Sequence, residues 1–257
     1  MRYELKCEKN PFLKKKIITF CVCLAVIAAL LVGGFFAYKT FFPKEVKEET
    51  PVVEVEKPKT ETPIKEVYDI VLDAGHGGHD PGCQWDDIYE KDIVLKLSEE
   101  IEKHLEKAGL RVYMTRRGDI HFDDIEDYDL IKRVELGEQH QPKLFVSMHV
   151  NFSEYEEPQG FEVVYNGKKK FAASSAKLIA KEVEDSGVIS SRGASETSDN
   201  APVYIVDYND CEAVLIETGF LSNAQDREIL TNDKKCQTMA KAIAQGIIKS
   251  LETKKDK

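Results

Sequence analysis

Hydrophobic and polar positions divide the chain into three regions, and the first contains a long run of uncharged residues. Residues 17–38, "IITFCVCLAVIAALLVGGFFAY", are 22 positions without a charge. As a helix this run would extend roughly 33 Å, which is enough to cross the hydrocarbon core of a bilayer. It is apolar on every side, whereas a helix on the surface of a soluble protein has one apolar face. The pattern predicts a transmembrane helix at 17–38.

The residues before this run indicate its orientation. Residues 1–16 carry six basic side chains and two acidic ones: Arg2, Lys6, Lys9, Lys14, Lys15 and Lys16 against Glu4 and Glu8. Basic residues stay on the cytoplasmic side, so 1–16 form a cytoplasmic tail and the rest of the chain is exported. A cleaved signal peptide is the alternative, but the run is longer than a usual signal core and no A-x-A site follows it. An uncleaved, single-pass signal anchor is expected.

The second region, residues 39–66, lacks helical periodicity. It is rich in Glu, Lys, Thr, Val and Pro. Such a composition is typical of a solvated, flexible linker.

The third region, residues 67–257, alternates strand and helix patterns. Buried strands are predicted at 67–72, 110–115, 144–150, 161–165 and 213–217. Helices are predicted at 92–107, 127–139, 171–185 and 235–251, where apolar residues recur at helical spacing. Strands that alternate with helices indicate a single α/β domain with a largely parallel sheet.

Charge and cysteine content exclude some classes of protein. The net charge of −10 disfavours a nucleic-acid-binding protein, which needs a clustered positive field. Three of the six cysteines, Cys83, Cys211 and Cys236, lie in the exported part. Three cysteines cannot all pair within one chain, so a disulfide framework is not expected.

Four polar residues stand where an α/β fold gathers its working groups. His76 follows the first strand, Glu90 precedes the first helix, His149 lies near the end of "LFVSMHV", and Glu217 ends "EAVLIE". Carboxyl ends of parallel strands meet at one edge of a sheet. Two histidines and a carboxylate leave a tetrahedral Zn²⁺ one open position for water, and a second carboxylate nearby can move protons.

Each of these residues also has a structural interpretation. His76 alone is typical of a hydrogen-bonded loop residue, and His149 of a histidine satisfied within a core. Glu90 is favoured at a helix start by the helix dipole. Glu217 is harder to explain, because a carboxylate after "AVLI" is costly to bury without a partner. Their joint placement at one edge favours the functional interpretation.

Five motifs resemble one enzyme family. "VLDAGHGGHDPGC", Glu90 before "KDIVLKL", "VYMTR", "LFVSMHVN" and "AVLIETGFLSN" occur in the order and spacing of the zinc-dependent N-acetylmuramoyl-L-alanine amidases, the amidase-3 family. The resemblance covers residues 67–251. It implies a three-layer α/β domain with a twisted sheet of about six strands and helices on both faces.

The resemblance also implies roles for individual residues. It assigns His76, Glu90 and His149 as zinc ligands and Glu217 as the catalytic glutamate. The implied substrate is peptidoglycan, cut between the lactyl group of N-acetylmuramic acid and the L-alanine of the stem peptide. Together with the predicted anchor, it implies a bacterial membrane protein with its catalytic domain on the cell-wall face.

Several further residues have either a structural or a functional role. Arg116 and Arg133 are expected to pair with acidic neighbours rather than to contact substrate. Asn151 is either a substrate contact or a turn residue. His79 is expected to be exposed. The acidic stretch 122–129, "FDDIEDYD", lacks the spacing and the glycine of an EF-hand, so a solvated loop and helix start are expected there.

Two other functions remain as alternatives. One is a different zinc hydrolase on the same scaffold, for instance a peptidase that acts within the stem peptide. The other is a catalytically silent wall-binding protein, which need not retain all four residues of the presumed site.

Overall fold

Six strands form the central sheet of the domain. The computed structural model describes residues 67–255; the predicted tail (1–16), membrane span (17–38) and linker (39–66) lie outside the described residues. The strand order is β4-β1-β5-β8-β6-β7, and only the β6–β8 pair is antiparallel. The strands are β1 (Ile70–Ala74), β4 (Val112–Met114), β5 (Leu144–Asn151), β6 (Phe161–Tyr165), β7 (Ser191–Glu196) and β8 (Ala213–Phe220). The predicted α/β fold with a mostly parallel sheet of six strands is confirmed.

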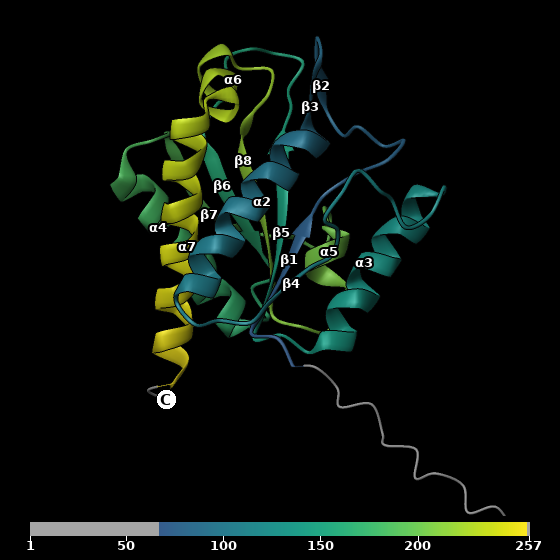
Figure 1. Ribbon diagram of the computed structural model, residues 1–257, viewed down its shortest axis with the longest axis vertical. Coiled ribbons are helices and arrows are strands. Elements are labelled where there is room, and N and C mark those ends of the chain that lie inside the picture. The colour runs from purple at the N-terminus through teal and green to yellow at the C-terminus, as the bar shows by residue number, and fades with distance from the viewer. Residues whose placement is uncertain (1–66, 256–257) are drawn as a thin grey trace, which may run out of the picture. The chain divides into compact units, whose positions relative to one another are not determined.

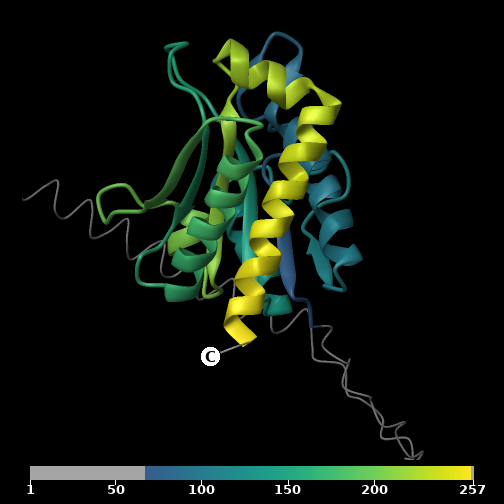
Figure 2. The same ribbon diagram turned by 90° about the vertical axis from the view of Figure 1, so that its left-hand side faces the viewer.

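Helices cover both faces of this sheet and complete three layers (Figure 1). One face carries α2 (Glu90–Lys107), α4 (Lys170–Ser186) and α7 (Asp233–Lys255), with α7 packed between the other two (Figure 2). The opposite face carries α3 (Glu126–His140) and α5 (Tyr204–Asp207), while α6 (Ala224–Thr231) packs against α7 and β8. Within 67–255, none of the helices combines the length and the apolar character needed to cross a bilayer.

The sheet separates two apolar clusters, one under each helical layer. The larger lies beneath α2, α4 and α7 and includes Ile101, Ile179 and Ile243. The smaller, which includes Val134 and Phe145, lies on the side of α3 and α5. Burying both faces explains the nearly continuous hydrophobic runs of β1, β5 and β8. The thiols of Cys83, Cys211 and Cys236 are free.

Two strand boundaries differ from the prediction for identifiable reasons. β1 begins at Ile70, because Val67 is exposed, and it continues through the fully buried Asp73. β8 continues past Glu217 to Phe220, so Glu217 lies within the strand and not at its end. Both strands continue through a carboxylate, Asp73 in β1 and Glu217 in β8, at which the sequence pattern predicts the end of the strand.

The structure also contains elements that the hydrophobic pattern did not indicate. β7 is a polar strand, "SRGASE", at the edge of the sheet, and its alternation is weak because much of it is exposed. The short hairpin β2 (Gln84–Trp85) and β3 (Ile88–Tyr89) and the short helices α5 and α6 were missed as well. None of these elements has enough apolar residues at a regular spacing to produce a recognisable period.

Candidate active site

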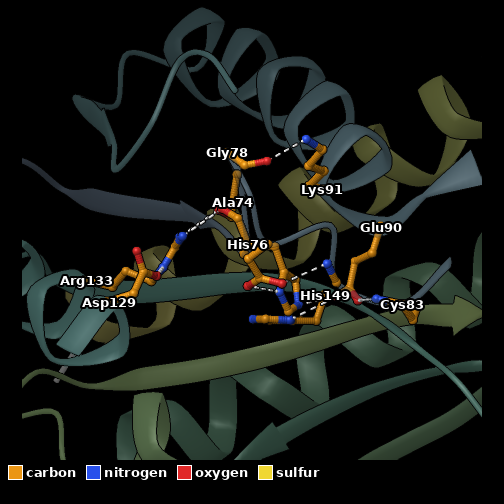
Figure 3. A network of polar contacts seen from close by, with 12 residues as sticks. Ala74, His76, Gly78, Cys83, Glu90, Lys91, Asp129, Arg133 and His149 are labelled. Carbon is orange, nitrogen blue, oxygen red and sulfur yellow. Dashed lines mark hydrogen bonds and ion pairs between the residues drawn. The ribbon is translucent and has the colours of Figure 1, made fainter. Parts of the chain in front are cut away.

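Three side chains from separate elements converge at the carboxyl edge of the parallel strands (Figure 3). His76 lies in the loop after β1, Glu90 is the first residue of α2, and His149 lies in β5. Glu90 Oε1 is 3.1 Å from His76 Nε2 and 3.0 Å from His149 Nδ1. One potential ligand atom of each residue lies within 4.8 Å of those of the others, so the predicted metal-ligand set is brought together.

Backbone groups fix the Glu90 carboxylate between the two imidazoles. Val150 N–H donates to Oε1 at 2.9 Å, and Cys83 N–H donates to Oε2 at 2.8 Å. Glu90 is buried, and the start of α2 favours its negative charge. The carboxylate is therefore held in place before any ligand arrives.

Two glycines make room for these ligands. A Cβ on Gly75 would lie 2.4 Å from Cε1 of His149, and a Cβ on Gly82 would lie 2.6 Å from Oε2 of Glu90. His76 itself has a φ of 60°, a conformation that residues other than glycine rarely adopt. The glycines of "DAGHGGHDPG" thus allow the loop to close around the ligand side chains.

The carboxylates and imidazoles of the cluster shift the pKa values of His76 and Glu90. Burial alone would lower the pKa of His76, but the carboxylates of Glu90 and Asp80 outweigh burial and raise this pKa to about 9. Burial would raise the pKa of Glu90, but its contacts with His149 and His76 hold that pKa well below its usual range. Asp80 Oδ2 lies 2.7 Å from His76 Nδ1, and this hydrogen bond orients the ring.

Glu217 lies beside this cluster on the neighbouring strand. It is paired in register with His149 across β5 and β8. Its Oε2 atom is inaccessible to solvent and has no hydrogen-bond partner among the described residues. Burial raises the pKa of Glu217, His149 lowers it, and the carboxylates of Glu90 and Glu162 raise it again, to about 7. A buried polar atom without a hydrogen-bond partner is costly. A group bound at the site would supply the missing partner of Oε2.

Arg133 is fully buried and does not reach the open side of the site. Its guanidinium pairs with Asp73 at 2.9 Å and with Asp129 at 2.5 Å, which is the acidic pairing that the sequence predicts. It also donates to the backbone carbonyls of Ala74 and His76 at 2.9 and 2.7 Å. Figure 3 shows Arg133 directed at Ala74, the last residue of β1 before the loop that carries His76. Arg133 therefore ties this loop to α3.

Arg116 is also fully buried, but its hydrogen bonds differ from the prediction. It donates to four backbone carbonyls, those of Ala74, Gly75, Lys91 and Gly118, at 2.8 to 3.0 Å. The hydrogen bonds of Arg116 thus go to main-chain groups where the sequence predicts acidic partners, while Asp73, Asp119 and Asp92 act on it through their charge. These four hydrogen bonds could not be predicted from the sequence, because the partners of Arg116 are main-chain groups.

Two other residues near the cluster make local contacts. Asn151, the last residue of β5, accepts a hydrogen bond at its Oδ1 from Phe152 N–H at 2.8 Å. The Cys83 thiol lies 3.4 Å from the carbonyl oxygen of Val150. Burial and the carboxylates of Glu90 and Glu217 raise the pKa of this thiol, so it remains protonated.

Comparison with known proteins identifies the family. A family model described as N-acetylmuramoyl-L-alanine amidase matches residues 70–249, which include every residue discussed above. The chain belongs to the amidase-3 family. It is 29% identical over 195 residues to the germination-specific N-acetylmuramoyl-L-alanine amidase of Bacillus subtilis, a match that covers 73% of this chain and 81% of that one.

Solved structures of family members have the same fold. The CwlD amidase of Clostridioides difficile, solved in complex with the GerS lipoprotein, is 30% identical with a TM-score of 0.66, and the match covers 72% of this chain and 99% of that one. The catalytic domain of CwlV from Bacillus (Paenibacillus) polymyxa var. colistinus is 28% identical with a TM-score of 0.64, over 73% and 98% of the two chains. The chain is an N-acetylmuramoyl-L-alanine amidase that acts on peptidoglycan.

The buried Arg133 pairs make a first prediction about this amidase. Replacing Arg133 with Met leaves the fully buried Asp73 without its cation. Breaking a buried ion pair in this way is expected to cost about 3–5 kcal/mol of unfolding free energy, measured by urea denaturation. Lys181→Met is the matched control, because Lys181 and Asp185 form an exposed pair on α4. Lys181→Met is expected to change the unfolding free energy far less than Arg133→Met, because exposed ion pairs contribute little. Equal costs for the two variants would contradict a stabilising role of the buried Arg133–Asp73 pair.

The same network makes the stability of the amidase depend on pH. Burial raises the pKa of Asp73, but Arg133 and the hydroxyls of Ser147 and Thr115 outweigh burial and hold it below its usual value. A depressed carboxylate pKa stabilises the folded state above the unfolded pKa of about 3.9, and this contribution is lost as the pH falls through the folded pKa. The difference in unfolding free energy between wild type and Asp73→Asn is therefore expected to narrow below about pH 4. A difference that stays constant from about pH 7 to about pH 3 would show that Asp73 is not the titrating group.

Proposed function

We propose that this amidase uses Zn²⁺ held by His76, Glu90 and His149, with Glu217 as its general base. The donor set supports zinc, because two imidazoles and one carboxylate oxygen are ligands that zinc prefers and that leave a position open. The unpartnered Glu217 Oε2 beside the cluster is the observation that carries the proposal. When bound, zinc lowers the pKa of a water molecule toward about 7 and polarises the scissile carbonyl.

Glu217 would then act first as the general base and afterwards as the general acid of the reaction. A general base works best when its pKa lies near the working pH, and burial brings the pKa of Glu217 to about 7. Its carboxylate accepts a proton from the attacking water and returns it to the nitrogen of L-alanine as the amide bond breaks. The products are the free lactyl carboxylate of the sugar and a stem peptide with a new amino terminus.

Hydrogen bonds to its backbone carbonyls would hold the loop of His76 in position for metal binding. Arg116 and Arg133 together bind the carbonyls of Ala74, Gly75 and His76. Preorganised ligands need no rearrangement when the metal or the substrate binds. We therefore assign both arginines as positioning residues for the metal-ligand loop.

The bond that is cut can be tested by labelling amino termini. An amidase frees the amino group of L-alanine, whereas the alternative, a zinc peptidase acting within the stem peptide, frees a different residue. We expect labelling of products released from purified peptidoglycan to give L-alanine as the new terminal residue. A new terminus at another residue of the stem peptide would overturn the proposed bond.

The N-terminal residues support a membrane-bound form of the enzyme. Residues 17–38 are uncharged and follow a basic tail, and residues 39–66 have the composition of a linker. We infer a single-pass anchor in the bacterial cell membrane, with the catalytic domain on the cell-wall face. Such a tether would place the active site near peptidoglycan close to the membrane.

Fractionation tests the anchor. The full chain is expected to stay with membranes after an alkaline carbonate wash, and a variant lacking residues 1–38 to become soluble. An amidase released with a new amino terminus near residue 39 would instead show that the segment is a cleaved signal peptide.

A further inference from the structure

A second group of potential metal ligands lies outside the catalytic cluster. His79, His121 and Asp124 each offer one ligand atom, and these atoms all lie within 4.8 Å of one another. His79 comes from the loop after β1, and His121 and Asp124 come from the segment between β4 and α3. We propose that these three residues bind a second divalent transition-metal ion, with Zn²⁺ the best match.

The side-chain geometry suits such an ion. The rings of His79 and His121 lie edge to face with their centroids 4.0 Å apart. His121 Nε2 lies 2.9 Å from Asp124 Oδ1, so a ring nitrogen already meets a carboxylate oxygen. Imidazole nitrogens favour zinc, copper or nickel over Mg²⁺ and Ca²⁺, which prefer sites made of oxygen ligands. Water would complete the coordination, because the side chain of Asp124 is 91% exposed.

The surroundings are acidic, which favours a cation. The cluster lines a pocket of about 320 Å³, to which Asp80, Asp123, Glu126 and Asp129 also contribute. Some of this charge is balanced, since Asp123 pairs with Lys132 and Asp129 with Arg133. The remaining field still attracts a positive ion to the two imidazoles.

The second site is connected to the first through the chain and through hydrogen bonds. Asp80 lines the pocket of the second cluster and also lies 2.7 Å from the Nδ1 atom of His76. Gly78, between His76 and His79, donates its N–H to Asp119 at 2.7 Å, and Lys91 binds both the Gly78 carbonyl and Asp119. An ion between His79 and His121 would add a further link between these two segments. Its role would be to steady the loop that carries the catalytic ligand His76.

Counting bound zinc tests the proposal. The full chain, stripped of metal, would be dialysed against Zn²⁺ alone, and bound zinc would be measured by mass spectrometry. We expect two ions per chain for the wild type and one for His121→Ala or His79→Ala. Asp124→Asn is a milder variant, expected to weaken binding of the second ion at an exposed position. His104→Ala is the matched control, because His104 lies on α2 outside both clusters, and it is expected to bind two ions.

The outcomes separate this site from the catalytic one. His149→Ala is expected to lose one ion and keep the one at His79 and His121. Loss of an ion in His121→Ala but not in His149→Ala would support the second site and contradict the catalytic ligand set. A wild-type chain whose single ion is lost in His149→Ala and kept in His121→Ala, or a His121→Ala variant that binds as many ions as the wild type, would overturn the second site.

Discussion

Glu217→Gln is expected to lower the rate of peptidoglycan hydrolysis by about 10³-fold while the catalytic zinc stays bound. The amide has almost the same shape as the carboxylate but cannot take up a proton near neutral pH. The three proposed zinc ligands, His76, Glu90 and His149, are unchanged in this variant. The loss should therefore appear in the rate of product release and not in the zinc content of the protein.

A second carboxylate provides the control for this variant. Glu182 lies on α4, where it pairs with Lys249 away from the catalytic cluster. Glu182→Gln removes the same charge and should hydrolyse peptidoglycan at close to the wild-type rate. If Glu217→Gln retains more than about a tenth of the wild-type rate, the base must be sought elsewhere.

His149→Ala is expected to lose both the catalytic zinc and the activity. Two remaining protein ligands bind zinc poorly, because metal binding depends on the number of ligands and on their geometry. The variant also opens space beside Gly75, against which the ring of His149 is packed. We expect hydrolysis to fall to the level of the chain treated with a chelator, a reduction of at least about 10³-fold.

Circular dichroism distinguishes loss of metal from loss of fold in His149→Ala. Circular dichroism should show the same secondary structure as the metal-free wild type, since β5 is held on both sides by β1 and β8. His140→Ala, which removes a histidine packed against Tyr68 and Tyr113, serves as the control and should keep the catalytic zinc. Full zinc content and activity in His149→Ala would refute its assignment as a ligand.

The sequence predicts the buried framework of this fold well. The apolar residues of α2 and α7 recur at helical spacing, and the structure has long helices there. The continuous apolar run of β5 likewise forms a buried strand. The polar edge strand β7 has no such period, because exposed edge positions impose little on the choice of side chain. The extent of β1 was missed because its buried Asp73 depends on partners from the residue after β4, from α3 and from β5. Those partners are visible only once the chain is folded.

The candidate site divides in a similar way. The sequence places His76, Glu90 and His149 at one edge because strand ends converge there, and the structure brings them into contact. It does not indicate the four carbonyls that bind Arg116, since backbone groups leave no pattern in a sequence. The second cluster was missed for another reason. His79 was expected to be an exposed residue and 122–129 a solvated acidic stretch, and only the folded loops bring His79 against His121.

The most direct test of the account is mass spectrometry of purified peptidoglycan after incubation with the metal-free chain and with the same chain reloaded with Zn²⁺. We expect intact stem peptides beginning at L-alanine only in the zinc-loaded sample, and glycan strands that have lost their peptides. Equal release by the metal-free chain would contradict zinc-dependent catalysis by His76, Glu90, His149 and Glu217.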